Sequence, residues 1–123
     1  MSFDNVYREF ILDHYRNPNN KGKLDDYDLK EEGVNPHCGD KIEVFIKLEN
    51  NKVTKIKHDG VGCAISQAGA SLITEEVKNK SRDDILKINT KEMKGMLQIP
   101  IDYTREKCAT LALNTIKQIL ENN

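Results

Sequence analysis

The sequence has no tryptophan, only 6% aromatic residues and no long apolar run. The scarcity of aromatic rings removes the stacking platforms and aromatic cages that many binding proteins use. A membrane span requires about 18 or more consecutive apolar residues, so none is predicted. The N-terminal segment carries charges where a signal peptide would be apolar. We therefore expect a soluble protein of the cytoplasm.

An excess of charge of one sign is also lacking. The chain has 19 basic and 20 acidic side chains, interspersed along its length, and a formal net charge of -1. Nucleic acids and anionic membranes are recognised by basic patches or stripes, so neither is an expected partner. The length of 123 residues and the 37% hydrophobic content fit one core, without a linker or an internal repeat. Residues 1–123 are predicted to form a single domain.

Hydrophobic periodicity changes along the chain from helical to strand-like and back to helical. Turn residues separate the segments, including Asn17-Pro18, Asn50-Asn51 and Pro100. The predicted elements are a helix at 3–16, strands at 28–34, 42–49 and 52–59, a helix at about 64–80, short helices capped by Ser81 and Thr90, and a last helix with periodic residues from Cys108 to Leu120. This order predicts an α+β fold, in which a three-stranded antiparallel sheet packs against an N-terminal helix and several C-terminal helices.

Cysteine is scarce, and its count is informative. The three residues Cys38, Cys63 and Cys108 make an odd number, so at least one thiol stays free or binds something. A disulfide framework is therefore the wrong first model. No CxxC pair is present, so tertiary folding must collect the three sulfur atoms if they act together.

Each cysteine has a local sequence that favours a thiolate. Cys38 lies in a predicted loop between Pro36 and Gly39, and Cys63 follows two glycines just before a helix. Cys108 falls in the opening turns of the last helix, one turn after Arg105. Helix N-termini and nearby cations stabilise anions, so we expect the pKa of each thiol to lie below its usual value of about 8.5.

Three thiolates leave a tetrahedral metal site one ligand short, and the sequence offers one candidate for it. Zinc takes four ligands, and cluster iron is likewise held by thiolates. Asp40 lies two residues after Cys38, close enough to complete the same site. A carboxylate oxygen is displaced more easily than a sulfur atom, which suits a site that releases its contents.

Structural interpretations of the same residues remain open. Cys108 lies on an apolar stripe, where a single cysteine is more typical of a core residue, and the glycines before Cys63 are compatible with a tight turn alone. Neighbouring side chains in an extended loop point apart, which favours a surface imidazole for His37 over a ligand. Arg105 is either a solvated side chain or a group that steadies a thiolate or persulfide on Cys108.

Four motifs in this order resemble the iron-sulfur cluster assembly scaffolds of the IscU, SufU and NifU N-terminal type. The resemblance covers most of the chain. Its segments are residues 13–22 (DHYRNPNNKG), 35–40 (NPHCGD), 60–66 (GVGCAIS) with 70–71 and 74–75, and 105–111 (REKCATL).

The resemblance implies a function and a set of site residues. Cys38, Cys63 and Cys108 match the three cluster cysteines of the family, and Asp40 matches the aspartate that shares their site. A family member of this type accepts persulfide sulfur from a cysteine desulfurase, assembles mainly a [2Fe-2S] cluster from iron and sulfur, and passes it to acceptor proteins. Here Cys38 is the expected sulfur acceptor, Cys108 the alternative acceptor and Arg105 a supporting residue.

Two departures from the IscU pattern leave further functions open. Lys107 stands where IscU-type members have histidine, and residues 99–103 (IPIDY) replace the Leu-Pro-Pro-Val-Lys motif, so a specialised Hsp70 chaperone is not an expected partner. Lys107 and Arg105 match SufU, although the distance from Cys63 to Cys108 is IscU-like. One alternative is therefore a zinc-dependent sulfurtransferase with Zn²⁺ in its resting state, and a second is a structural zinc module for protein binding.

Overall fold

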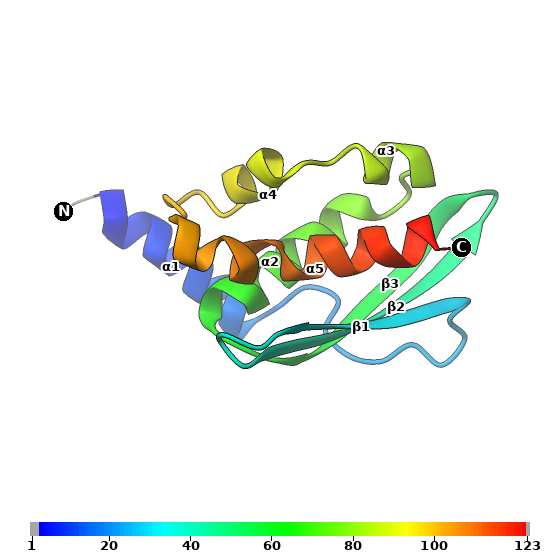
Figure 1. Ribbon diagram of the computed structural model, residues 1–123, viewed down its shortest axis with the longest axis horizontal. Coiled ribbons are helices and arrows are strands. Elements are labelled where there is room, and N and C mark those ends of the chain that lie inside the picture. The colour runs from blue at the N-terminus through cyan, green and yellow to red at the C-terminus, as the bar shows by residue number, and fades with distance from the viewer. Residues whose placement is uncertain (1–2, 123) are drawn as a thin grey trace.

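The computed structural model describes residues 3–122, with side chains from residue 8 onward, and it confirms the predicted α+β fold (Figure 1). The N-terminal helix comes first, three strands follow, and four helices complete the chain. These elements are α1 (Phe3–Arg16), β1 (Leu29–Asn35), β2 (Asp40–Glu49), β3 (Lys52–Val61), α2 (Ala64–Val77), α3 (Arg82–Leu86), α4 (Thr90–Met96) and α5 (Tyr103–Glu121). No helix in the described part of the chain is long and apolar enough to cross a membrane.

The three strands form an antiparallel meander in the order β1-β2-β3, as predicted. Strand boundaries lie within two residues of the predicted ones, as is usual for element ends. Asn50 and Asn51 join β2 to β3 and have φ angles of 53° and 65°. Asparagine tolerates this left-handed conformation better than most residues, which explains the tight hairpin at this position.

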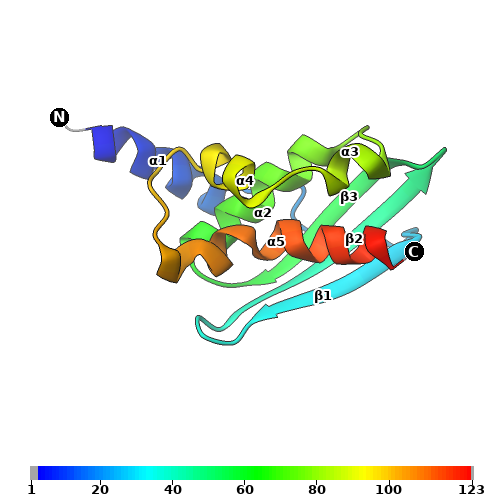
Figure 2. The same cartoon turned by 45° about the horizontal axis from the view of Figure 1, so that its top comes forward.

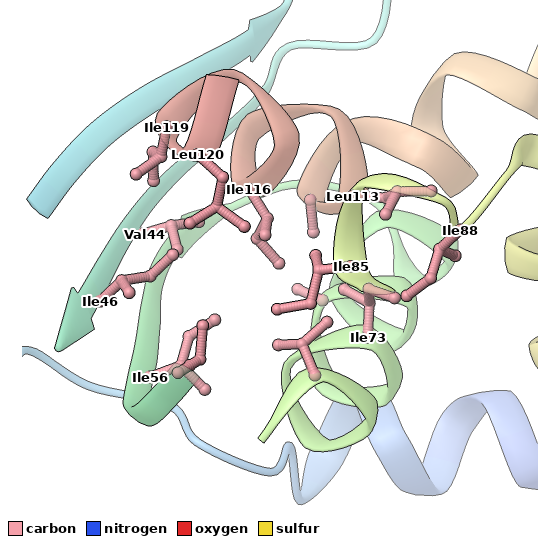
Figure 3. Packing of buried hydrophobic residues seen from close by; sticks show 14 of the residues in the cluster. Val44, Ile46, Ile56, Ile73, Ile85, Ile88, Leu113, Ile116, Ile119 and Leu120 are labelled. Atoms are coloured by element: carbon pink, nitrogen blue, oxygen red, sulfur yellow. The ribbon is translucent and has the colours of Figure 1, made fainter. Parts of the chain in front are cut away.

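The helices cover one face of the sheet (Figure 1), and the larger of two apolar clusters packs the helices against the strands. Strand alternation turns Ile42, Val44 and Ile46 toward this core, where each is at most 3% exposed. Figure 3 shows side chains from β2, β3, α2, α3 and α5 meeting there. The periodic stripe predicted for the last helix supplies a large part of this packing.

Two predicted helix boundaries are corrected by the structure. The helix after Cys63 ends at Val77 and not near Lys80, because Lys78 leaves helical geometry and Asn79 has a φ of 66°. The cap of α4 is Asn89 and not Thr90: the Asn89 side chain accepts from the N–H of Glu92, whose side chain accepts from the N–H of Asn89. The predicted cap at Ser81 is confirmed, because its Oγ accepts from the N–H of Asp84.

The first helix packs against α2, as its amphipathic pattern predicts. Ile11 is 4% exposed on this face, and the His14 ring lies 2.8 Å from the Ser71 Oγ on α2. Phe3, Val6 and Tyr7, which the pattern places on the same face, lie outside the residues whose side chains are described.

Three segments that are distant in the sequence meet at one end of the molecule. They are the turn between β1 and β2, the start of α2 and the start of α5, which lie at the same end of the layers in both views (Figure 2). Each segment carries one of the three cysteines. The fold thus brings the cysteines together although no short motif does so.

Candidate metal centre

Cys38 lies in the turn that joins β1 to β2. Residues 36–39 make the turn, and Asn35 and Asp40 face each other where the strands end. The N–H of Cys38 donates to the carbonyl oxygen of Asn35 at 3.3 Å. Gly39 has a φ of +70°, which glycine adopts without the steric cost of a Cβ. This turn leaves Cys38 exposed, as the sequence predicts.

Asp40 is fully buried at the start of β2, with 0% of its surface exposed. Its Oδ1 accepts from the N–H of Cys63 at 2.9 Å, and its Oδ2 accepts from the Nδ2 of Asn35 at 3.4 Å. A buried carboxylate is costly unless it is hydrogen-bonded or holds a cation. Its two N–H donors orient Asp40 within the site.

Cys63 is the N-cap residue of α2, with φ and ψ of -70° and 167°. Its side chain makes no capping hydrogen bond, whereas its N–H donates a hydrogen bond to Asp40 Oδ1. A Cβ on Gly62 would lie 2.6 Å from Asp40 Oδ1 and would also collide with the Oγ of Ser66. Glycine at position 62 therefore permits the close approach of this turn to the buried carboxylate.

Cys108 is 3% exposed, and its Sγ donates to the Sγ of Cys38 at 3.2 Å. Burial, followed by contacts with Cys38 and Asp40 and the charge of Cys63, raises the pKa of the Cys108 thiol well above its usual value. The expectation that the helix start and Arg105 lower this pKa is wrong for the metal-free site. Desolvation and anionic neighbours outweigh the helix dipole here, and a bound cation would reverse that balance.

The structure gathers three of the four predicted ligands directly. Ligand atoms of Cys38, Asp40 and Cys108 lie within 4.8 Å of one another. The half-buried Cys63 contributes its N–H and its electrostatic effect, but its Sγ is not part of this three-residue group. Cys38, Asp40 and Cys108 thus lie close enough to share one ion, and the Cys63 side chain borders them through its contact with the Cys108 thiol. The four-ligand site stays a prediction.

Two other candidates from the sequence lie outside the group. His37 is exposed, as expected of a surface imidazole. The Arg105 side chain is also exposed, and within residues 8–122 no hydrogen bond or ion pair links it to the cysteines. Its backbone N–H donates to Asp102 Oδ1 at 3.0 Å, which caps α5. A supporting role for Arg105 stays a prediction.

Asn35 is a site residue that the sequence interpretation missed. It is 4% exposed, and its side chain contacts both Asp40 and Cys108. A signal exists in the strand pattern, because alternation from Leu29 places every second residue, including Asn35, on the inner face of β1. The loop motif by itself does not indicate that the Asn35 side chain points toward the interior.

The donor set fits a metal ion that prefers sulfur. A tetrahedral Zn–S bond of about 2.3 Å places ligand atoms about 3.8 Å apart, so three atoms within 4.8 Å of one another need only small shifts to share one ion. Thiolate ligands select zinc, copper(I) or iron-sulfur clusters, and the carboxylate supplies a weaker fourth bond. Fold and site define a small α+β protein with a cysteine-rich candidate metal site at one end.

Comparison with known proteins identifies the family. The NifU-like N-terminal domain model matches residues 6–122, and the chain belongs to this family. The zinc-dependent sulfurtransferase SufU of Bacillus subtilis is 32% identical, over 95% of this chain and 90% of its own. The iron-sulfur cluster assembly scaffold protein IscU of Thermotoga maritima is 34% identical, over 98% of this chain and 96% of its own.

A solved structure has the same fold. The putative iron-sulfur cluster assembly scaffold protein for the SUF system from Fervidobacterium islandicum superposes with a TM-score of 0.82 at 26% identity, covering 97% of this chain and 99% of that one. The resemblance described from the motifs is thus confirmed at the level of family and fold.

Proposed function

We propose that this protein is an iron-sulfur cluster assembly scaffold. In this function it accepts sulfur from a cysteine desulfurase, assembles a [2Fe-2S] cluster on Cys38, Cys63, Cys108 and Asp40, and transfers the cluster to acceptor proteins. The observation that carries the proposal is the convergence of thiols from the β1–β2 turn and α5 with a buried carboxylate. Both closely similar relatives, IscU and SufU, bear names that refer to cluster assembly or sulfur transfer.

The accessibility of the thiols supports Cys38 as the first sulfur acceptor. Cys38 is exposed on a turn, whereas Cys108 is buried behind it at 3.2 Å. A donor protein therefore reaches Cys38 first, and sulfur can move to Cys108 without leaving the site. Arg105, exposed one turn before Cys108, is proposed to steady a persulfide there.

Exposed apolar side chains near the site support a protein as the sulfur donor. Val34 and Val61 are 55% and 67% exposed, and both pair with Lys41, so they lie in one row across the sheet. Tyr103, at the start of α5, is 87% exposed. Large apolar groups around a functional site are typical of a docking surface for another protein.

Anaerobic reconstitution tests the scaffold function. The metal-free protein is incubated with ferrous iron, cysteine, a cysteine desulfurase and a reductant, and absorption and Mössbauer spectra are recorded. The expected product is a [2Fe-2S] cluster that moves to an apo-ferredoxin. Cys38→Ser, Cys63→Ser and Cys108→Ser are expected to lose it, and His37→Ala serves as the neighbouring control. Tight zinc binding without cluster formation would contradict the scaffold function.

A zinc-dependent sulfurtransferase is the second candidate, and a specific observation favours it. Lys107, and not histidine, precedes Cys108, and its side chain is exposed at the start of α5. In this function zinc organises the same four residues, and Cys38 leaves the metal to attack the persulfide of the desulfurase. Desulfurase turnover is then stimulated by the zinc protein and not by the metal-free protein.

The same assay distinguishes a structural zinc module. A protein that uses zinc only to hold its fold would bind one zinc ion, lose stability without it, and leave desulfurase turnover unchanged. Asp40→Ala would then alter zinc affinity but no sulfur transfer, because none would occur.

A further inference from the structure

Asn35 lies among the proposed ligands and contacts several of them. It is the last residue of β1, and the register places it opposite Asp40. Its carbonyl oxygen accepts from the N–H of Cys38, and its Nδ2 lies 3.4 Å from Asp40 Oδ2 and 3.5 Å from Cys108 Sγ. One residue therefore contacts three of the four proposed ligands.

The Nδ2 atom of the Asn35 carboxamide, and not its oxygen, faces the proposed ligands. An amide nitrogen carries two N–H donors, and the two acceptors that it faces are a carboxylate oxygen and a sulfur atom. A carbonyl oxygen in the same place would face the Asp40 carboxylate and repel it. The donor orientation thus places two N–H groups between two potential anions.

The acceptor end of the same amide is unsatisfied. Oδ1 of Asn35 is buried without a hydrogen-bond partner, in a residue that is 4% exposed. An unpaired buried polar atom costs about 1–3 kcal/mol, and an apolar side chain of the same shape would avoid this cost. An asparagine is therefore unfavourable for stability here, which points to a role in the site for its N–H groups.

We propose that Asn35 is a positioning residue of the metal centre, which holds Asp40 and Cys108 together through its carboxamide N–H groups and donates an N–H···S hydrogen bond to the Cys108 sulfur of the loaded site. The proposal rests on the function proposed above, because it requires these residues to bind metal. Hydrogen bonds to ligand sulfur draw electron density from the thiolate and alter both metal affinity and the energies of the metal–sulfur bonds.

Cobalt(II) titration of the metal-free protein tests this role. Asn35→Leu keeps nearly the same shape and removes both donors. The expected result is a 10- to 100-fold weaker affinity for cobalt, as for other groups that orient metal ligands (about 10–100-fold). The sulfur-to-cobalt charge-transfer band is expected to move to lower energy, because a thiolate without its N–H donor is oxidised more easily.

Control measurements separate a positioning role of Asn35 from a purely structural one. Thr115→Val removes a buried hydroxyl elsewhere on α5 and is expected to leave affinity and spectrum unchanged. An Asn35→Leu spectrum and affinity equal to wild type would overturn the proposal, whatever happens to the melting temperature. Weaker cobalt binding with an unchanged charge-transfer energy would also overturn it, because the Cys108 sulfur would then have no N–H donor to lose.

Three further outcomes are distinguishable. If Asn35→Leu does not melt cooperatively, Asn35→Ala removes the same donors without adding bulk and is measured in its place. If the wild-type protein binds neither cobalt, zinc nor iron, the proposed function fails and the role of Asn35 fails with it. If the wild type binds metal and the variant binds it equally well, only the role of Asn35 is wrong.

Discussion

The two ends of α5 are both buried, but in opposite chemical surroundings. Toward its C-terminal end Ile116, Ile119 and Leu120 are at most 1% exposed and pack among apolar side chains of the sheet and α3 (Figure 3). Toward its start Cys108 is 3% exposed, and it contacts a thiol and a carboxamide. The same helix thus anchors the core and carries a site residue.

This difference separates stability from chemistry along one helix. Burial of apolar surface stabilises the fold by about 25 cal/mol per Å², whereas buried polar groups cost free energy unless each finds a partner. The site end contains the unpaired Oδ1 of Asn35 and a thiol whose pKa burial raises. The apolar end therefore provides the stability that lets the site end hold unfavourable groups in place.

Oxidation of the metal-free site is expected to change the free energy of unfolding strongly. Hydrogen peroxide takes two electrons from two thiols, so a disulfide joins Cys38 to Cys108 and two water molecules are released. Because these residues are 70 positions apart, the bond restricts the unfolded chain and is expected to stabilise the protein by about 4 kcal/mol. Urea unfolding with and without a thiol reductant measures this difference.

Peptide mapping of the oxidised protein shows which thiols lie together. Cys63→Ser is expected to form the same disulfide, and bound zinc is expected to prevent it. A disulfide from Cys63 to either of the other cysteines, formed in preference, would show that the pairing of Cys38 and Cys108 is not the dominant arrangement in solution.

Truncation at the apolar end is expected to reduce stability without changing the site. Ile116 is 0% exposed, so Ile116→Ala removes three buried carbon atoms and leaves a cavity. The expected loss is about 2–5 kcal/mol in the free energy of unfolding, measured in urea on the metal-free protein. Under conditions where the variant is folded, its zinc affinity should match wild type; a parallel loss of affinity would show that the two ends are not separable.

Gly62→Ala, at the site end, is expected to reduce zinc affinity as well as stability. The added Cβ would collide with Asp40 Oδ1 and Ser66 Oγ, so the carboxylate must move. We expect a loss of about 1–3 kcal/mol in stability from overpacking, and a 10- to 100-fold loss of zinc affinity, of the order seen when ligand-orienting groups are disturbed (about 10–100-fold). Chelator competition measures the affinity.

Gly95→Ala is the matched control for that substitution. A Cβ on Gly95, in α4, would meet nothing within 4 Å, and its φ is not in the left-handed region. The variant is expected to gain about 0.5–1 kcal/mol from the better helix propensity of alanine. Its zinc affinity should be that of wild type, and an equal loss in both glycine variants would contradict the steric argument.

An effect that depends on pH is expected from His58 on β3. Burial, more than any other cause, lowers the pKa of His58 below 6.5, and its Nε2 donates to the carbonyl oxygen of Asn19 at 2.9 Å. Below pH 6.5 the unfolded chain binds a proton that the folded protein resists, so stability falls as pH falls. The slope is at most about 1.4 kcal/mol per pH unit.

His58→Gln isolates this contribution. Glutamine keeps an N–H donor near Asn19 but does not titrate. The difference in unfolding free energy between variant and wild type should change between pH 7 and pH 5 and stay constant above pH 7.5. A constant difference across the whole range would show that His58 is protonated equally in both states.

Local sequence patterns predicted most of the fold. Alternation in residues 42–48 defined the central strand, and the stripe from Cys108 to Leu120 defined the last helix. Helix ends were less predictable, as the Asn89 cap and the early end of α2 show. Such boundaries depend on which of several neighbouring polar groups forms the capping hydrogen bond. The pattern of apolar residues does not determine that choice.

By itself the sequence determined where the candidate ligands lie along the chain: three cysteines at a turn and two helix starts, and an aspartate two residues from the first. Those positions follow from steric preferences of neighbouring residues. Only the tertiary structure decided that Cys38, Asp40 and Cys108 meet, that the Cys63 side chain contacts Cys108, and that Asn35 lies beside them. The raised pKa of Cys108 has the same origin, because burial and distance depend on packing between segments far apart in the chain.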